Sequence, residues 1–148
     1  MRRAALQVLR ELASGSEALF RAALDALEDS SLAVRGEATR ILGDFVDERA
    51  TRPLIRMLFD PSWNVRFSAE NALSSLGRRV VADLIAVLGE DSLVARRSAL
   101  SALGRLGDTS ARGPIEQMLS REDDPVTVAI AKDALKRLRG ETGRGKGA

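Results

Sequence analysis

Apolar residues recur along the chain with the spacing of an α-helix. In one segment they stand at i, i+4 and i+8, as Leu19, Ala23 and Leu27. The same spacing occurs in three later segments, which end at Leu58, Leu88 and Leu119. This spacing places the apolar residues on one face of a helix. The pattern therefore predicts four amphipathic helices, called A helices here.

A second motif, Arg-x-x-Ala-x-x-x-Leu, lies between the A helices and predicts B helices. Its copies are Arg2/Ala5/Leu9, Arg35/Ala38/Leu42, Arg66/Ala69/Leu73, Arg96/Ala99/Leu103 and, without the arginine, Val128/Ala131/Leu135. The alanines of successive copies are 33, 31, 30 and 32 residues apart. A period in this range is the signature of a solenoid. The predicted fold class is therefore all-α, an α-solenoid of antiparallel helix pairs with about four repeats and an N-terminal half repeat.

The register of the two motifs predicts where the helices begin and end. The expected helices cover residues 2–14, 17–28, 32–45, 48–59, 63–76, 78–89, 93–106, 109–120 and 125–139. The expected N-caps of the B helices are Ser31, Ser62, Ser92 and Asp124, and those of the A helices are Ser16, Asp47, Gly77 and Asp108. Side-chain oxygens at such positions accept the first free backbone N–H groups. Pro53 and Pro114 share one register, where a proline kinks or restarts a helix.

The amino-acid composition excludes several kinds of catalytic and metal-binding sites. The chain has neither cysteine nor histidine. A Ser-His-Asp or Cys-His triad and a zinc site with His or Cys ligands are therefore excluded. The carboxylates stand in expected caps, turns and mixed-charge faces, so no acid/base pair stands out. We therefore predict no catalytic, metal-binding or cofactor-binding residues and no cofactor.

Charge is distributed unevenly along the chain. The net charge is +2, and residues 136–148 carry +4, so residues 1–135 carry −2. We expect one repeat domain over residues 1–139 and a disordered, basic, glycine-rich tail over residues 140–148. No apolar run approaches the ~20 residues that a membrane helix needs. The expected location is therefore cytoplasmic, with no membrane partner.

The stretch "EDSSLAVRGEATRILGDFVDERATRPLIRML" and its two successors resemble HEAT repeats, specifically the phycobilisome-lyase HEAT-like kind. The pattern Asp-x5-Val-Arg-x2-Ala-x3-Leu is complete from Asp29 and from Asp60, whereas the third copy has Glu90 and Ala95 at the acid and valine positions. The resemblance implies an ion-pair ladder between successive repeats. Its expected members are Asp29, Arg35, Asp60, Arg66 and Arg96. Trp63 takes a position held elsewhere by leucine, and we expect it to pack at a turn between repeats; a ligand-stacking role is the alternative.

The resemblance also implies that the B helices line a concave surface. Opposite their buried side, with Val34, Ala38 and Ile41, stand residues that the repeat leaves free. The expected partner-binding residues are Arg3, Gln7, Arg40, Phe67, Asn71, Arg97 and Ser101, with Arg10 close by. Aromatic and arginine residues dominate binding energy at interfaces. For Phe67, a second interpretation remains open, in which its ring packs on its own helix.

Three functions of different classes follow. The leading hypothesis is a non-catalytic scaffold or adaptor that binds another protein, with an acidic or amphipathic segment as its ligand. The arginines of the B helices also leave nucleic-acid binding open. The third alternative, a bilin lyase or another chromophore-handling protein, rests on the family resemblance alone.

Overall fold

The computed structural model describes residues 1–140 of the chain. These residues fall into two compact units, Met1–Leu76 and a second unit that begins at Gly77. The predicted single domain over residues 1–139 stays a prediction. Most of the predicted disordered tail, residues 141–148, lies outside the described residues. No helix within residues 1–140 is both long and apolar enough to cross a membrane.

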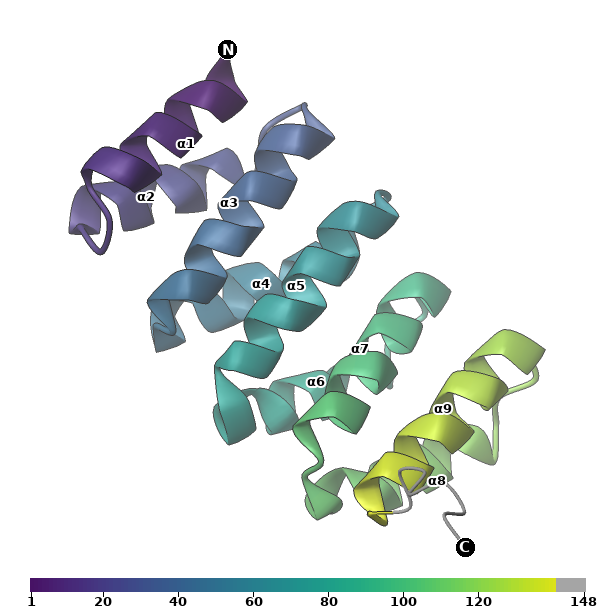
Figure 1. Cartoon of the computed structure of the whole chain (residues 1–148). Helices are drawn as coiled ribbons and strands as arrows, with labels where there is room; N and C mark the ends of the chain where they lie inside the picture. The colour runs from purple at the N-terminus through teal and green to yellow at the C-terminus, as the bar shows by residue number, and fades with distance from the viewer. Residues whose placement is uncertain (141–148) are drawn as a thin grey trace, which may run out of the picture. The chain divides into compact units, whose positions relative to one another are not determined.

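The first unit contains five α-helices and one short 3₁₀ helix. They are α1 (Arg2–Leu12), α2 (Glu17–Ala26), α3 (Leu32–Phe45), η1 (Glu48–Ala50), α4 (Thr51–Met57) and α5 (Trp63–Ser75). Within this unit α1, α3 and α5 lie side by side in one layer, with α2 and α4 forming a second layer behind them (Figure 1). The B helices of the sequence are therefore α1, α3 and α5, and the A helices are α2 and α4.

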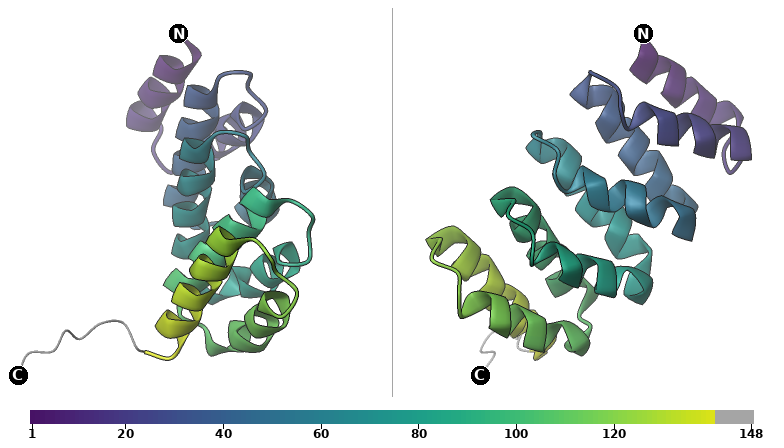
Figure 2. Two further views of the ribbon diagram at one scale, coloured as in Figure 1. Left: turned by 90° about the vertical axis from the view of Figure 1, so that its right-hand side faces the viewer. Right: turned by 180° about the vertical axis from the view of Figure 1, so that it is seen from behind.

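The second unit repeats the same plan. Its elements are η2 (Gly77–Val80), α6 (Val81–Val87), α7 (Leu93–Leu106), η3 (Thr109–Ala111), α8 (Arg112–Leu119) and α9 (Pro125–Leu138). The B helices α7 and α9 lie side by side, and α6 and α8 cover one face of that pair; this layer faces the viewer in the right-hand view of Figure 2. The helix pairs confirm the predicted all-α fold class of the solenoid type.

The core lies between the A and B layers of each unit. In the first unit, Leu19, Ala23 and Leu27 of the A pattern are at most 2% exposed, and Ala38 and Ile41 of α3 are fully buried. Burial of each aliphatic side chain of this size contributes about 1.5–3 kcal/mol. The hydrophobic periodicity of the sequence therefore identified the faces that form the core.

Two α-helices of the B layer approach each other closely at a glycine. A Cβ atom at Gly43 of α3 would lie 2.8 Å from the Cβ atom of Ala72 and 3.0 Å from its Cα atom. In the second unit, a Cβ atom at Gly104 of α7 would lie 3.1 Å from the Cα atom of Ala134. Carbon atoms pack best at about 3.5–4.0 Å. The absence of a side chain at these glycines therefore sets the spacing within each B-helix pair.

Three of the four predicted A helices begin as a 3₁₀ helix rather than as an α-helix, whereas α2 begins at residue 17 as predicted. Helices were expected over 48–59, 78–89 and 109–120, whereas each begins with a short 3₁₀ helix before the α-helix. Pro53 and Pro114 stand third in α4 and α8, where the missing N–H needs no partner. They restart these two helices. The same change from 3₁₀ helix to α-helix occurs before α6, where there is no proline. Proline is therefore not required for it.

The predicted N-cap residues of the B helices are confirmed, but only some of them bond through their side chains. Ser92 and Asp124 accept N–H groups of their own helices as expected. Ser31 and Ser62 are N-caps without such a side-chain hydrogen bond, and their own N–H groups donate to Asp29 and Asp60 at 2.8 Å. Gly77 was also expected to be a cap but is the first residue of η2, with a φ of 71° that favours glycine.

Candidate functional site

The most buried ion pair of the first unit joins α3 to the turn before α5. The Arg35 guanidinium donates to the Asp60 carboxylate at 2.7 and 3.1 Å, and to the backbone oxygens of Asp29 and Ser30 at 2.9 and 3.1 Å. Burial alone would raise the pKa of Asp60. The hydrogen bonds from Arg35 and from the Ser62 N–H outweigh burial and hold this pKa below its ordinary value.

Other repeat arginines have comparable contacts. Arg2 pairs with Asp29 at 2.8 Å, and Arg96 pairs with Glu122 at 3.0 Å. In each case the acid stands six positions before the motif position of the next B helix, as Asp60 does for Arg35. The sequence pattern did not single out Glu122, although its register position would have identified it. Arg66 donates to the backbone oxygens of Asp60 and Pro61 at 2.7 and 2.9 Å.

These contacts make the ladder arginines poor candidates for ligand binding. The Arg35 side chain is 15% exposed and that of Asp60 is 5% exposed. An arginine that already binds a carboxylate and two backbone oxygens has few donors left for a ligand. The structural role of the ladder is a prediction that stability measurements can test.

A hollow of about 460 Å³ lies on the B layer of the first unit, across α1, α3 and α5. Its lining residues are Arg10, Arg40, Gly43, Asp44, Phe67, Ser68, Asn71, Ala72 and Ser75. Because Gly43 and Ala72 carry little or no side chain at the close approach of α3 and α5, they form part of the floor of the hollow. We call this feature the first-unit hollow.

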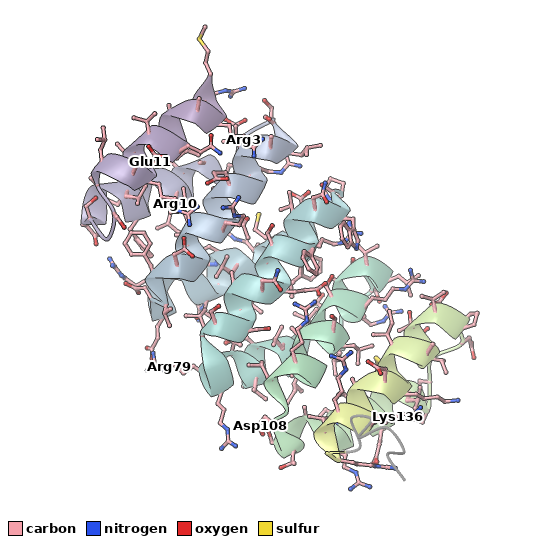
Figure 3. All side chains as sticks on the ribbon, in the orientation of Figure 1. Arg3, Arg10, Glu11, Arg79, Asp108 and Lys136 are labelled. Carbon is pink, nitrogen blue, oxygen red and sulfur yellow. The ribbon has the colours of Figure 1, made fainter. Side chains whose placement is uncertain are left out.

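Charges of both signs surround the first-unit hollow. Glu37 is 3% exposed, and its carboxylate accepts from Arg40 at 3.1 Å and from Arg10 at 3.5 Å. Arg10 also pairs with Asp44 at the rim. The side chain of Arg10 extends from α1 toward α3 in Figure 3. These two arginines and two carboxylates have a formal net charge of zero, so the hollow is polar without a strong field of one sign.

An exposed pair of aromatic rings stands beside the hollow. Trp63 and Phe67 lie one turn apart on α5 and stack, with ring centroids 5.2 Å apart and planes 14° apart. Trp63 is 63% exposed and Phe67 is 38% exposed. The prediction that Trp63 packs at a turn between repeats is wrong, because the first helical position of α5 faces outward and offers no pocket for a ring. The alternative in which Phe67 packs on its own helix agrees with this stack.

The structure brings together only part of the predicted partner-binding set. Arg40, Phe67 and Asn71 line the first-unit hollow together. Arg3 and Gln7 are exposed on α1 but do not line it. Five lining residues were not predicted: Gly43, Asp44, Ser68, Ala72 and Ser75. Of these, Gly43 had a signal in the sequence, because a glycine recurs in the same register as Gly104.

The remaining predicted residues, Arg97 and Ser101, belong to the second unit. The Arg97 guanidinium donates to Asp124 at 2.7 Å and to the Thr127 hydroxyl at 3.0 Å. Asp124 also accepts from the hydroxyl and the N–H of Thr127, at 2.7 Å each. The hydrogen bonds from Thr127, followed by that from Arg97, lower the pKa of Asp124 to about 2. Arg97 therefore binds the first turn of α9.

Within residues 1–140, acidic side chains form no group of three or more that could hold a metal ion. The carboxylates nearest the first-unit hollow, Glu37 and Asp44, are bound by Arg10 and Arg40. These contacts occupy oxygen atoms that a general base would need in order to reach a proton of a substrate. The hollow is therefore better suited to binding than to acid–base chemistry.

Comparisons with known proteins agree with the helix-pair architecture. A family model described as HEAT repeats matches residues 20–95. A second model, described as PBS lyase HEAT-like repeat, matches residues 95–121. A comparison with curated proteins found no match.

Proposed function

Since the chain belongs to the family of HEAT repeat proteins, we propose that it is a non-catalytic scaffold or adaptor that binds another protein. The proposed docking surface is the B layer of the first unit, where the Trp63–Phe67 pair adjoins the first-unit hollow. The exposed aromatic pair is the observation that carries the proposal. Two stacked rings on a rigid helix offer a large apolar contact at little entropic cost, because few side-chain torsions must be ordered.

The chemistry around the rings indicates what kind of segment fits. An apolar side chain of the partner would cover Trp63 and Phe67, whose exposed faces lose water on binding. Next to them, the Arg40 side chain is 52% exposed although it bonds Glu37. Its remaining N–H groups can therefore donate to a carboxylate of the partner, which would fix the direction of the bound chain. We propose an amphipathic segment with an apolar anchor followed by an acidic residue.

The two alternative functions have less support. Nucleic-acid binding requires several arginines available to phosphates, whereas Arg10 and Arg97 each bond a carboxylate. The repeat described by the name PBS lyase matches residues 95–121. Those residues form most of α7, all of η3 and α8, and the turns that follow α7 and α8. Their helices pack as the other repeats do, and no described feature of them favours chromophore chemistry.

Trp63 allows a direct test, because it is the only tryptophan of the chain. Peptides that bind the protein can be selected from a displayed library, and their binding can be followed by Trp63 fluorescence and by calorimetry. We expect selection of amphipathic peptides with an acidic residue. Burial by such a peptide should shift the Trp63 emission to shorter wavelength and protect it from aqueous quenchers. Selected peptides without any effect on Trp63 would contradict the proposal.

A matched pair of phenylalanines supplies the control. Phe67 is 38% exposed and lines the hollow, whereas Phe59, in the turn after α4, is 39% exposed and does not. Phe67→Ala should weaken binding by about tenfold, or ~1.4 kcal/mol. Phe59→Ala should leave the affinity within about twofold, which is under ~0.5 kcal/mol. Equal effects of the two substitutions would place the docking surface elsewhere.

A further inference from the structure

The outer side of α1 carries a stripe of exposed apolar residues. Met1, Ala5, Val8 and Leu12 follow one another at intervals of four, three and four residues, which is one face of a helix. All four are exposed; Val8 is 53% exposed and Leu12 is 81% exposed. The only buried residue of α1 is Leu6, on the side toward the rest of the unit. We call the four residues the α1 stripe.

In the repeat register, the α1 stripe corresponds to positions that are buried in the later B helices. In the later B helices, the residues at the positions of Met1, Ala5 and Val8 are at most 4% exposed. They are Val34, Ala38 and Ile41 in α3, Val65, Ala69 and Ala72 in α5, and Thr127, Ala131 and Ala134 in α9. On each of these helices the face packs against a neighbouring B helix. In the described residues, α1 has no helix on this side, as Figure 1 shows.

The outward face of α9 is polar at positions that are buried in other B helices. Lys132 takes the register position of Thr39 and Leu100, both of which are fully buried in α3 and α7. Lys136 takes the position of Gly43 and Gly104, where the next B helix approaches most closely. Two exposed lysines at these positions make this face polar. Stacking of α1 onto the α9 of another copy would bury both lysine charges and is therefore disfavoured.

We propose that the α1 stripe binds the α1 stripe of a second copy of this chain, with the two helices antiparallel. A twofold axis between Ala5 and Val8 places Ala5 opposite Val8 of the second copy and Met1 opposite its Leu12. The four positions are thus self-complementary, as an isologous interface requires. The small side chain of Ala5 at the centre permits the close helix approach that Gly43 and Ala72 already show within the unit.

Charge also favours the antiparallel arrangement. Glu11 is exposed in the last turn of α1 (Figure 3). The first turn of α1 contains no acidic residue, although backbone N–H groups and the helix dipole favour negative charge there. In an antiparallel pair, Glu11 lies near the first turn of the second copy and supplies that charge. A parallel pair would place the two first turns, with their arginines, side by side.

The size of the surface sets the expected strength of the pair. A helix of 11 residues is only ~16 Å long at 1.5 Å per residue. It therefore contributes well under the ~800 Å² per partner of a standard stable interface. The pair should be weak and should form only at concentrations of roughly tens of micromolar or above, in the range of transient contacts.

Two valines of almost equal exposure make the test specific. Val8 of α1 is 53% exposed and Val126 of α9 is 52% exposed. In sedimentation velocity between about 10 µM and 1 mM, a range that brackets the strength expected of a weak contact, the wild type should shift from monomer to dimer. Val8→Glu should remain monomeric, Val126→Glu should behave as the wild type, and both should keep the wild-type far-UV dichroism. A wild type that stays monomeric, or a dimer that Val8→Glu retains, overturns the proposal.

Cross-linking tests the orientation, because the chain has no cysteine. A mixture of Ala5→Cys and Val8→Cys chains should form a mixed disulfide under mild oxidation, since these positions face each other. Leu12→Cys alone should form no disulfide dimer, because Leu12 faces Met1 of the second copy; a rapid Leu12→Cys dimer would overturn the antiparallel arrangement. The test is independent of the proposed docking surface, because Val8→Glu should bind a peptide at Trp63 as the wild type does.

Discussion

Gly43 and Gly36 lie on the same helix, α3, yet alanine should have opposite effects at the two positions. A Cβ atom at Gly36 would have a single neighbour, a methyl carbon of Val65 at 4.0 Å, which is an ordinary contact. A Cβ atom at Gly43 would lie 2.8 and 3.0 Å from the Cβ and Cα atoms of Ala72. The backbone of α5 is one of these obstacles, so a change of rotamer cannot relieve the contact. The helices α3 and α5 must separate locally to admit it.

The magnitude follows from two opposing effects. Replacing glycine by alanine within a helix stabilises by roughly 0.5–1 kcal/mol at either position, because alanine loses less backbone entropy on folding. Overpacking a close contact costs about 1–3 kcal/mol. Gly36→Ala should therefore raise the free energy of unfolding by ~0.5–1 kcal/mol. Gly43→Ala should lower it by ~1 kcal/mol, so that the variants differ by about 1–3 kcal/mol, which is the steric cost alone.

Urea unfolding followed by Trp63 fluorescence measures this difference in the first unit, because Trp63 begins α5. With a slope of ~2 kcal/mol per molar urea, the midpoints of the two variants should differ by about 1 M. Ala72→Gly in the Gly43→Ala background removes the opposing Cβ atom and should recover part of the loss in a double-mutant cycle. If Gly43→Ala proves as stable as Gly36→Ala, the close approach does not set the helix spacing, and the reasoning fails.

Two further predictions concern the turns. Arg66 donates to the backbone oxygens of Asp60 and Pro61 at 2.7 and 2.9 Å, and Arg66→Ala removes both donors. This substitution should lower the free energy of unfolding by about 1–3 kcal/mol. An unchanged melting curve would exclude a structural role for this arginine. The pKa of Asp124 is lowered from 3.8 to about 2 in the folded chain, so its charged form stabilises the fold above pH 3.8, and this contribution is lost as the pH falls toward 2. Asp124→Asn should therefore melt with a weaker dependence on pH between these values than the wild type, and an equally steep loss of melting temperature would refute that assignment.

The helices could be predicted from the sequence because the same pattern of apolar residues recurs in each repeat. An isolated i, i+4, i+8 run is ambiguous, but Leu19, Ala23 and Leu27 have equivalents in every repeat. The structure buries these three residues, as the pattern predicts. The 3₁₀ starts of the A helices had no comparable signal, since η2 lacks the proline that marks η1 and η3. They depend on how the chain enters the next helix pair, which is a property of packing rather than of local propensity.

The candidate site was predictable only in part, for a different reason. Register identified Arg40, Phe67 and Asn71 as positions opposite the core, and these residues line the hollow. It could not show that Arg97 is bound by Asp124 and Thr127, because rotamers of long side chains are chosen by neighbours that differ between repeats. The exposure of Trp63 was also missed, since leucine at the same position suggested a buried ring.

Departures from the repeat are therefore the most informative residues of this chain. A position that keeps its residue type in four of the five copies, such as that of Arg35, is explained by contacts within the fold. Trp63 in a leucine position and Lys136 in a glycine position have no such explanation inside their own repeat. Both are exposed, so neither substitution improves the core. Trp63 exposes a large apolar ring on one surface of the first unit, whereas Lys136 places a positive charge on the outward face of α9. Helices of the same repeat can thus present different surfaces through single substitutions.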